Sequence, residues 1–254
     1  MHSSAAPVGA LLRQWRQRRR LSQLDLALDA EVSTRHLSYV ETGRAAPSRE
    51  MLLRLAERLE VPLRERNRLL TAAGYAPMFG ERRLDDPALA ATREALERVL
   101  QGHEPCPALL VDRHWTLVSA NRMVPLLLQG AAPALLQPPL ILNLAQWRAH
   151  LLARLAQQIE TSGDPTLIAL AEELRGYPAP DAAAADASHA DAAAVAVPLQ
   201  LRSPEGVLTL IGTITVFGTP VDVTLSELAL ETFLPADAAT AQALRRLAAG
   251  LPPV

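Results

Sequence analysis

Residues 21–77 read LSQLDLALDAEVSTRHLSYVETGRAAPSREMLLRLAERLEVPLRERNRLLTAAGYAP, and this stretch decides how the first third of the chain folds. Ser22, Ser33 and Ser48 each stand just before apolar residues at helical spacing, which is the position of a helix N-cap. Gly43 and Gly74 follow such runs and are typical of helix ends. The stretch therefore predicts four short helices joined by tight turns.

A fifth helix is expected ahead of this stretch, at about residues 8–19, where Leu12 and Trp15 share one apolar face. The five helices together predict a compact all-α domain over residues 1–80. About three residues separate the second helix, at about residues 23–29, from the third, so these two helices must cross at a steep angle. This arrangement is a helix-turn-helix.

In these capping and apolar residues, the stretch at residues 21–77 resembles the phage-repressor-like (XRE-type) helix-turn-helix transcriptional regulators. The resemblance implies that the third helix enters the major groove of double-stranded DNA. There Arg35 can donate two parallel hydrogen bonds to guanine, and Thr34 can place its methyl group against thymine. The expected contacts to base edges are Ser33, Thr34, Arg35 and Tyr39. The expected contacts to phosphate are Gln23, His36, Ser38, Thr42, Arg44 and Arg49.

The same resemblance assigns two structural positions. Glu41 matches a position that pairs with an arginine of the first helix, here Arg16, and this ion pair would tie the third helix to the first. Glu31 stands where these regulators usually carry glycine, because the backbone of that turn tends to have a positive φ angle. A residue with a side chain costs about 1 kcal/mol in that conformation, so the fold should survive with a slightly altered turn.

The charge of the chain is divided between its two parts. Residues 1–80 hold 13 Arg and 8 acidic residues, whereas residues 81–254 hold 12 Arg and 19 acidic residues. A basic first part favours a polyanion as partner, and an acidic remainder disfavours one. The chain has no Lys, so every phosphate contact must come from guanidinium, hydroxyl, amide or backbone groups.

Few residues suggest catalysis, a metal site or a membrane. Cys106 is the single cysteine, which excludes an intramolecular disulfide and a cysteine-based zinc cluster. No serine stands in a nucleophile-elbow sequence, and no glycine-rich phosphate loop is present. The N-terminus lacks the apolar stretch of a signal peptide, and prolines interrupt the most apolar run, residues 126–144. We therefore expect a cytoplasmic protein without metal or membrane partner that is not an enzyme.

The rest of the chain predicts a helical connector at residues 81–107 and a mixed domain at residues 108–254, in which residues 178–194 form an alanine-rich loop. Helices are expected after Asn121, Asn143, Asp164 and Asp237, each of which can act as an N-cap. Strands are expected at residues 108–112, 115–120, 195–202, 207–217 and 221–233. This order predicts an α+β domain whose antiparallel sheet is covered by helices on one face.

Three stretches of this domain, PALLVDRHWTLVSAN, DPTLIALAEELRGYP and TVFGTPVDVTLSELALETFLPAD, resemble the ligand-binding domain of MmyB-like regulators. The resemblance implies a PAS-like fold with a pocket between sheet and helices. It also implies an apolar small-molecule ligand such as a fatty acid, and we expect no other cofactor. Each candidate residue could instead pack the core, cap a helix or be solvated. The candidates for the pocket are Trp115, Asn121, Trp147, Arg148, Leu151, Ile211, Thr213, Thr215 and Phe217, with Arg122 and His150 as further candidates to anchor a polar head group.

Together these observations predict a sequence-specific DNA-binding transcription regulator whose DNA binding responds to a small ligand. Because one such domain makes few phosphate contacts, we expect a homodimer on a palindromic operator, with the two domains about 34 Å apart. The alternative is a DNA-binding or protein-interaction module whose second domain is a dimerisation scaffold without ligand.

Overall fold

The structure is a computed structural model that describes residues 7–128, 140–178, 197–218, 220 and 222–251. The chain divides into two units, of which the first contains the chain up to Arg83 together with Glu160–Ser162 and Thr219–Ser226, and the second contains the rest. Apart from Pro178, the alanine-rich loop expected at residues 178–194 lies outside the described residues.

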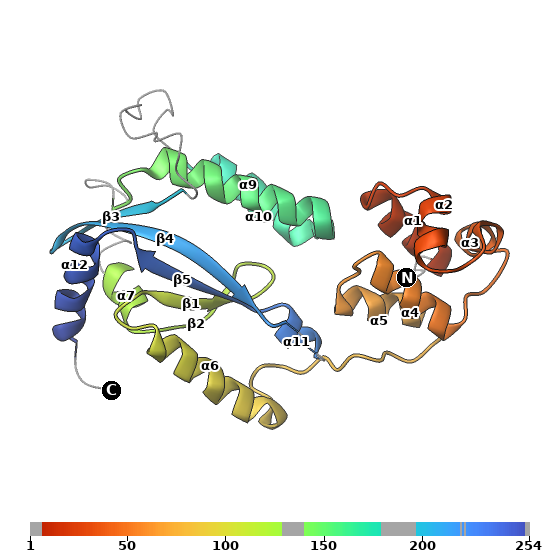
Figure 1. Cartoon of the computed structure of the whole chain (residues 1–254), viewed down its shortest axis with the longest axis horizontal. Helices are drawn as coiled ribbons and strands as arrows, with labels where there is room; N and C mark the ends of the chain where they lie inside the picture. Colours follow the sequence, from red (N-terminus) through yellow and green to blue (C-terminus); the bar gives the residue numbers. More distant parts are fainter. Residues whose placement is uncertain (1–6, 129–139, 179–196, 219, 221, 252–254) are drawn as a thin grey trace. The chain divides into compact units, whose positions relative to one another are not determined.

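The first unit contains the five predicted helices (Figure 1). Ser22, Ser33 and Ser48 each accept a hydrogen bond from the backbone N–H three residues ahead, as N-caps do. Gly43 and Gly74 follow helix ends with φ angles of 74° and 83°, which only glycine adopts at little cost. The helices are α1 (Val8–Arg18), α2 (Gln23–Asp29), α3 (Thr34–Glu41), α4 (Arg49–Arg58) and α5 (Leu63–Ala72).

Apolar side chains from all five helices form the core of this unit. A close approach of two backbones fixes α3 within it, because a Cβ atom at Gly9 of α1 would lie 2.2 Å from the carbonyl oxygen of Val40. Only glycine allows α1 to pack this tightly against α3. The core includes Leu12, Trp15, Leu26, Leu37, Val40, Leu52, Leu55 and Leu69, all of which are buried.

The first unit also contains a segment from far along the chain, residues 219–226. Within this unit the backbone N–H of Val223 donates to the carbonyl of Gly80 at 2.7 Å, and Asp222 forms a parallel bridge with Gly80. Asp222 is 2% exposed, and its carboxylate lies 3.5 Å from a guanidinium nitrogen of Arg82. The residues that follow α5 in sequence are therefore held by hydrogen bonds to this later segment.

The same segment corrects the strand predicted at residues 221–233. Its first part is a short helix, α11 (Val223–Ser226), and only its second part is a strand. Asp222 causes the difference, because its carboxylate accepts from the N–H of Thr224 and its carbonyl accepts from the N–H of Ser226, which starts a helical turn.

The second unit contains a five-stranded antiparallel sheet in the order β2-β1-β5-β4-β3, which confirms the predicted α+β class. In the register of β4 and β5, Gly212 lies opposite Phe233 and Ile214 opposite Glu231, so these four residues share one face. The strands are β1 (Ala108–Val111), β2 (Leu117–Ala120), β3 (Leu199–Ser203), β4 (Gly206–Val216) and β5 (Ala229–Pro235).

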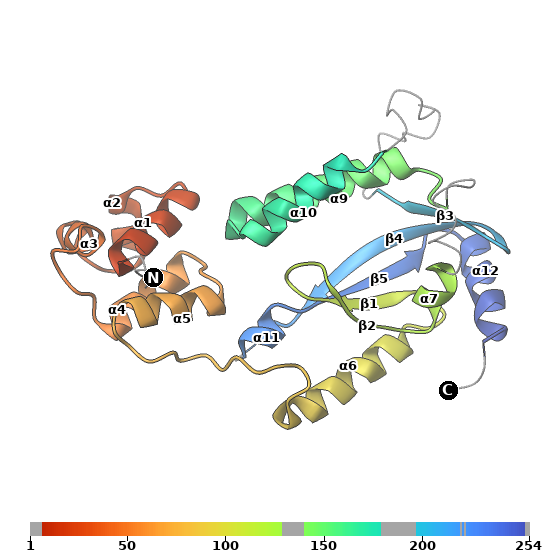
Figure 2. The same ribbon diagram turned by 180° about the vertical axis from the view of Figure 1, so that it is seen from behind.

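Helices lie on both sides of this sheet, so the expectation of helices on one face was wrong. Helices α9 and α10 lie on one side, and α6 and α7 lie on the other (Figures 1 and 2). Both faces need cover because the buried Leu110 and Leu230 pair on the face opposite to Glu231 and Phe233. The helices are the 3₁₀ helix η1 (Pro87–Leu89), α6 (Ala90–Gly102), α7 (Met123–Leu128), α9 (Leu144–Ser162), α10 (Pro165–Gly176) and α12 (Ala238–Ala249).

Within the described ranges, the protein has neither a membrane-spanning helix nor a cluster of metal-binding side chains. None of the helices there combines the length and the apolar character that crossing a bilayer requires. The same residues contain no group of three or more His, Cys, Asp or Glu side chains placed to hold a metal ion.

Candidate nucleic-acid interface and ligand pocket

Helix α3 has one apolar face and one polar face. Leu37 and Val40 are fully buried in the core of the first unit. The polar residues lie on the other side of the helix, where Arg35 and His36 are exposed and Tyr39 is half-buried. The expected base-edge set of Ser33, Thr34, Arg35 and Tyr39 is therefore found together at the first two turns of one solvent-facing surface.

Arg35 and Tyr39 hold each other in place across one helical turn. The Nε atom of Arg35 donates to the phenol oxygen of Tyr39 at 3.1 Å, and the guanidinium lies 5.4 Å from the centre of the Tyr39 ring. The terminal Nη atoms of Arg35 have no hydrogen-bond partner among the described residues. Tyr39 thus orients the guanidinium while leaving its outer edge able to donate to a base.

The expected phosphate contacts surround this surface. His36 and Ser38 lie on α3 itself, and Thr42 caps its end by donating from its hydroxyl to the carbonyl of Ser38 at 2.7 Å. Arg44 and Arg49 are exposed, in the turn after α3 and in the first turn of α4. They provide two positive charges on the side of the molecule where α3 ends.

Gln23 has a different neighbour from the one that sequence reasoning considered. Its side-chain amide nitrogen donates to the carboxylate of Glu41 at 2.8 Å, so that α2 is joined to α3 at this point. The expected contact of Gln23 with phosphate stays a prediction, which would have to use the second hydrogen of the same amide. No pattern in the sequence predicted the hydrogen bond to Glu41, because Gln23 and Glu41 are 18 residues apart.

Glu41 is the centre of a buried polar network that joins three helices. Its side chain is 1% exposed and accepts from Nε of Arg16 at 2.6 Å and from Nη2 at 2.9 Å. Arg16 also donates to the carbonyl of Leu21 at 2.8 Å. Burial alone would raise the pKa of Glu41, but the hydrogen bonds from Arg16 and Gln23 and the charge of Arg16 outweigh burial, so the pKa is lowered. The carboxylate stays charged and fixes the angle of α3.

The turn between α2 and α3 tolerates Glu31 in a glycine-like conformation. Glu31 has a φ angle of 54°, in the left-handed region that glycine adopts most easily. The turn nevertheless closes, since the N–H of Val32 donates to the carbonyl of Ala27 at 2.9 Å. The departure from glycine at this position therefore leaves the helix-turn-helix geometry in place.

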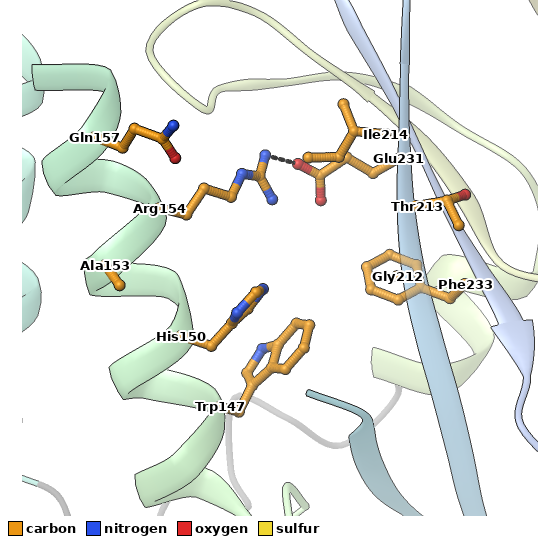
Figure 3. A pocket seen from close by; sticks show the side chains of 10 residues that line it. All are labelled: Trp147, His150, Ala153, Arg154, Gln157, Gly212, Thr213, Ile214, Glu231 and Phe233. Carbon is orange, nitrogen blue, oxygen red and sulfur yellow. Dashed lines mark hydrogen bonds and ion pairs between the residues drawn. The ribbon is translucent and has the colours of Figure 1, made fainter. Parts of the chain in front are cut away.

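The second unit contains a pocket of about 450 Å³ between α9 and the strands β4 and β5 (Figure 3). Its helical wall consists of Trp147, His150, Ala153, Arg154 and Gln157. Its other wall consists of Gly212, Thr213, Ile214, Glu231 and Phe233. Three of the residues that sequence reasoning proposed, Trp147, His150 and Thr213, are in this lining.

The pocket has an aromatic part and a charged part. The rings of Trp147 and His150 lie 5.2 Å apart, and Phe233 faces them from β5. Arg154 points from α9 towards β5 and forms an ion pair with Glu231 (Figure 3). Sequence reasoning did not propose Arg154 or Glu231, because the pairing depends on the rotation of α9 and on the register of β5.

Three other proposed pocket residues, Asn121, Arg148 and Trp115, lie outside this lining and have structural contacts. Asn121 is 4% exposed and bonded to backbone groups, and Arg148 donates to the carbonyls of Leu174 and Arg175 at 2.9 and 2.7 Å. The indole N–H of Trp115 donates to Gln158 at 2.6 Å. The remaining proposed residues outside the lining are Arg122, Leu151, Ile211, Thr215 and Phe217.

Comparisons with known proteins connect both units to gene regulation. A helix-turn-helix domain model matches residues 7–69, and the model of the MmyB-like transcription regulator ligand binding domain matches residues 92–247. The chain belongs to the MmyB-like transcription regulators. Among solved structures it is similar to the clp gene regulator ClgR from Corynebacterium glutamicum, with 30% identity over 39% of this chain and 90% of that chain and a TM-score of 0.24. A comparison with curated proteins gives no match.

These matches agree with the chemistry of the two units. The helix-turn-helix domain makes this MmyB-like protein a DNA-binding transcription regulator, and its second domain is of a ligand-binding type. The family models point to regulation and not to an enzyme.

Proposed function

We propose that this MmyB-like regulator reads a specific operator with the outer face of α3 and that a small molecule in the pocket modulates this binding. One observation carries the first part. The Arg16–Glu41–Gln23 network fixes α3 so that Arg35, held by Tyr39, presents its terminal nitrogens away from the core. A guanidinium fixed in this way can donate to O6 and N7 of one guanine in the major groove.

We further propose that the regulator acts as a homodimer on a palindromic operator. A single copy of α3 with Arg44 and Arg49 reaches few phosphates, which gives little affinity at physiological salt. Two copies about 34 Å apart would double the number of contacts and would match a palindrome. Native mass spectrometry of the protein with its selected DNA should then show two chains on each duplex.

Replacing Arg35 with alanine tests the assignment of the reading surface. We expect Arg35→Ala to weaken binding to the selected operator by about five-fold or more, in line with about 1–3 kcal/mol for a bidentate contact to guanine. Sequence preference should relax at one guanine in each half-site. Selection of binding sites from a random DNA pool and a gel-shift titration would measure both effects.

Arg68 provides the matched control for this experiment. It is exposed on α5 and pairs with Glu65 on the same helix, so Arg68→Ala removes the same charge away from α3. We expect the control to keep the operator affinity within about two-fold, since surface ion pairs contribute little to stability. Unchanged affinity and unchanged preference in Arg35→Ala would refute the reading surface.

The ligand part of the proposal rests on the lining of the pocket and on the connectivity of its strands. Trp147, Ile214 and Phe233 suit an apolar body such as the chain of a fatty acid derivative. In sequence, β4 and β5 flank residues 219–226, which belong to the first unit and hydrogen-bond to the residues after α5. A change in the spacing of the two strands would therefore act on the unit that contains α3.

Filling the pocket from inside tests this regulation without a known ligand. A Cβ atom at Gly212 would make ordinary contacts of 3.7 Å with Phe233 and 3.8 Å with Trp147, so Gly212→Leu adds a side chain inside the pocket. We expect this variant to change the operator affinity at least five-fold, within the usual range of allosteric coupling. Gly176→Leu adds the same side chain at the end of α10, outside the pocket lining, where nothing lies within 4 Å of the added Cβ, and should leave affinity unchanged. Equal affinity of both variants and wild type would count against regulation through this pocket.

A further inference from the structure

The two charged side chains of the pocket, Arg154 and Glu231, form an ion pair, so their net charge is zero. Arg154 donates from Nη2 to Oε1 of Glu231, and the two side chains are 18% and 16% exposed. The guanidinium of Arg154 also lies 4.5 Å from the centre of the Trp115 ring, a second contact that restrains it. The pair is therefore positioned before any ligand arrives.

Each member of the pair has hydrogen-bonding capacity left over. The Nε atom of Arg154 is closed off from the pocket, so the donor available to a ligand is the terminal Nη1 atom, which donates no hydrogen bond in the part of the chain that the structure describes. Among the same residues, Oε2 of Glu231 accepts no hydrogen bond. The pocket thus offers one donor and one acceptor side by side, and burial makes an unpaired donor costly.

We infer that this pocket takes a neutral amphiphile whose polar end is an amide, with an adjacent acceptor and donor. Such a group can accept from Arg154 through its carbonyl and donate to Glu231 through its N–H, so both free positions are used. This inference rests on the proposed function of the pocket and names the chemistry of its ligand.

Charged head groups are disfavoured by the same pair. A carboxylate could bind Arg154 only by competing with Glu231, and its charge would then lie against the charge of Glu231 in a partly buried site. An ammonium group would meet the converse difficulty, because Arg154 lies beside the only carboxylate in the lining. A neutral amide meets neither repulsion.

Paired probes that differ only in the head group test this inference on the full chain. The probes are decanamide with decanoate and 4-phenylbutanamide with 4-phenylbutanoate, so that chain-like and aromatic bodies are both sampled. Titration calorimetry, or the change in tryptophan fluorescence caused by a ligand beside Trp147, gives each dissociation constant. In the wild type we expect each bound amide to be at least ten-fold tighter than its carboxylate.

Glu231→Gln reverses the expected preference. It removes the carboxylate and leaves the positive charge of Arg154 uncompensated, so the carboxylate of each pair should gain at least ten-fold in affinity. Glu172→Gln is the matched control, because Glu172 is exposed on α10 outside the pocket, and it should keep the wild-type preference.

The possible results separate this inference from the function on which it rests. If the carboxylates bind the wild type as tightly as the amides, the inference about the head group is overturned while ligand binding stands. If none of the four probes binds either the wild type or Glu231→Gln, the pocket is no amphiphile site, and the inference falls together with the proposed ligand. If Glu231→Gln fails to fold, the comparison of amides with carboxylates in the wild type still decides the head group. Operator binding is measured in a separate experiment.

Discussion

Replacing Glu41 with alanine should destabilise the helix-turn-helix unit by about 3–5 kcal/mol, the usual cost of removing one partner from a buried ion pair. The side chain of Arg16 is only 11% exposed and would lose both of its bonds to the carboxylate. The side-chain amide of Gln23 would lose the same acceptor. Urea unfolding followed by circular dichroism would measure the loss in the free energy of unfolding.

Glu57→Ala is the control for this variant, because Glu57 is an exposed acid on the neighbouring helix α4. It should change the free energy of unfolding by less than about 0.5 kcal/mol, as surface substitutions usually do. A loss below 1 kcal/mol in Glu41→Ala would mean that the network does not fix α3. The operator affinity of Glu41→Ala should also fall, since the angle of α3 depends on the same bonds.

The pH dependence of stability offers a second readout of the same carboxylate. Its pKa is lowered in the folded protein relative to the ordinary value of 4.5, so the folded state binds this proton less readily than the unfolded state. The stabilisation from Glu41 is therefore complete above the unfolded pKa and is lost as the pH falls through the lower, folded value. Glu41→Gln should abolish this part of the acid sensitivity, which a comparison of unfolding curves below pH 4.5 would show.

The first unit was predictable because its signals are local. Ser22, Ser33 and Ser48 act within three residues of themselves, and Gly43 ends the helix that precedes it. The pairing of Arg16 with Glu41 came from resemblance, and the bond from Gln23 was missed because it joins side chains brought together only by packing. Local chemistry thus predicts the helices, whereas the contacts among them require the fold.

The pocket was harder to predict because both faces of β4 carry similar residues. Sequence reasoning favoured the odd-numbered positions 211–217, which are apolar or hydroxyl-bearing, but the pocket is lined mainly by Gly212 and Ile214 from the other face. Glycine gives no apolar signal, and Glu231 resembles a solvent-facing residue of an edge strand until its register beside Ile214 is known. A shift of a strand by one residue moves every side chain to the opposite face of the sheet, so the strand register decides which residues line such a pocket.

The role of Asn121 could not be predicted from the sequence either, because it depends on contacts that only the fold brings together. Sequence reasoning proposed it as a ligand contact, whereas the structure places it in a buried junction where four backbone groups converge. Its Oδ1 accepts from the N–H of Ala108 at 3.2 Å and of Met123 at 3.3 Å. Its Nδ2 donates to the carbonyls of Leu100 at 3.2 Å and Cys106 at 2.8 Å. One side chain therefore joins the end of α6, the start of β1 and the start of α7.

Asn121→Ala should destabilise the second unit by about 3 kcal/mol, because each buried backbone group left without a partner costs about 1–3 kcal/mol and part of the loss is recovered by relaxation. Gln101→Ala, an exposed change on α6 next to the same junction, should cost less than about 0.5 kcal/mol. Differential scanning calorimetry would show the effect as a lower melting temperature for the second unit, with the transition of the helix-turn-helix unit unchanged. An equal melting temperature in Asn121→Ala and wild type would show that the four bonds contribute nothing to stability, and Asn121 would then be open again to a role towards ligand.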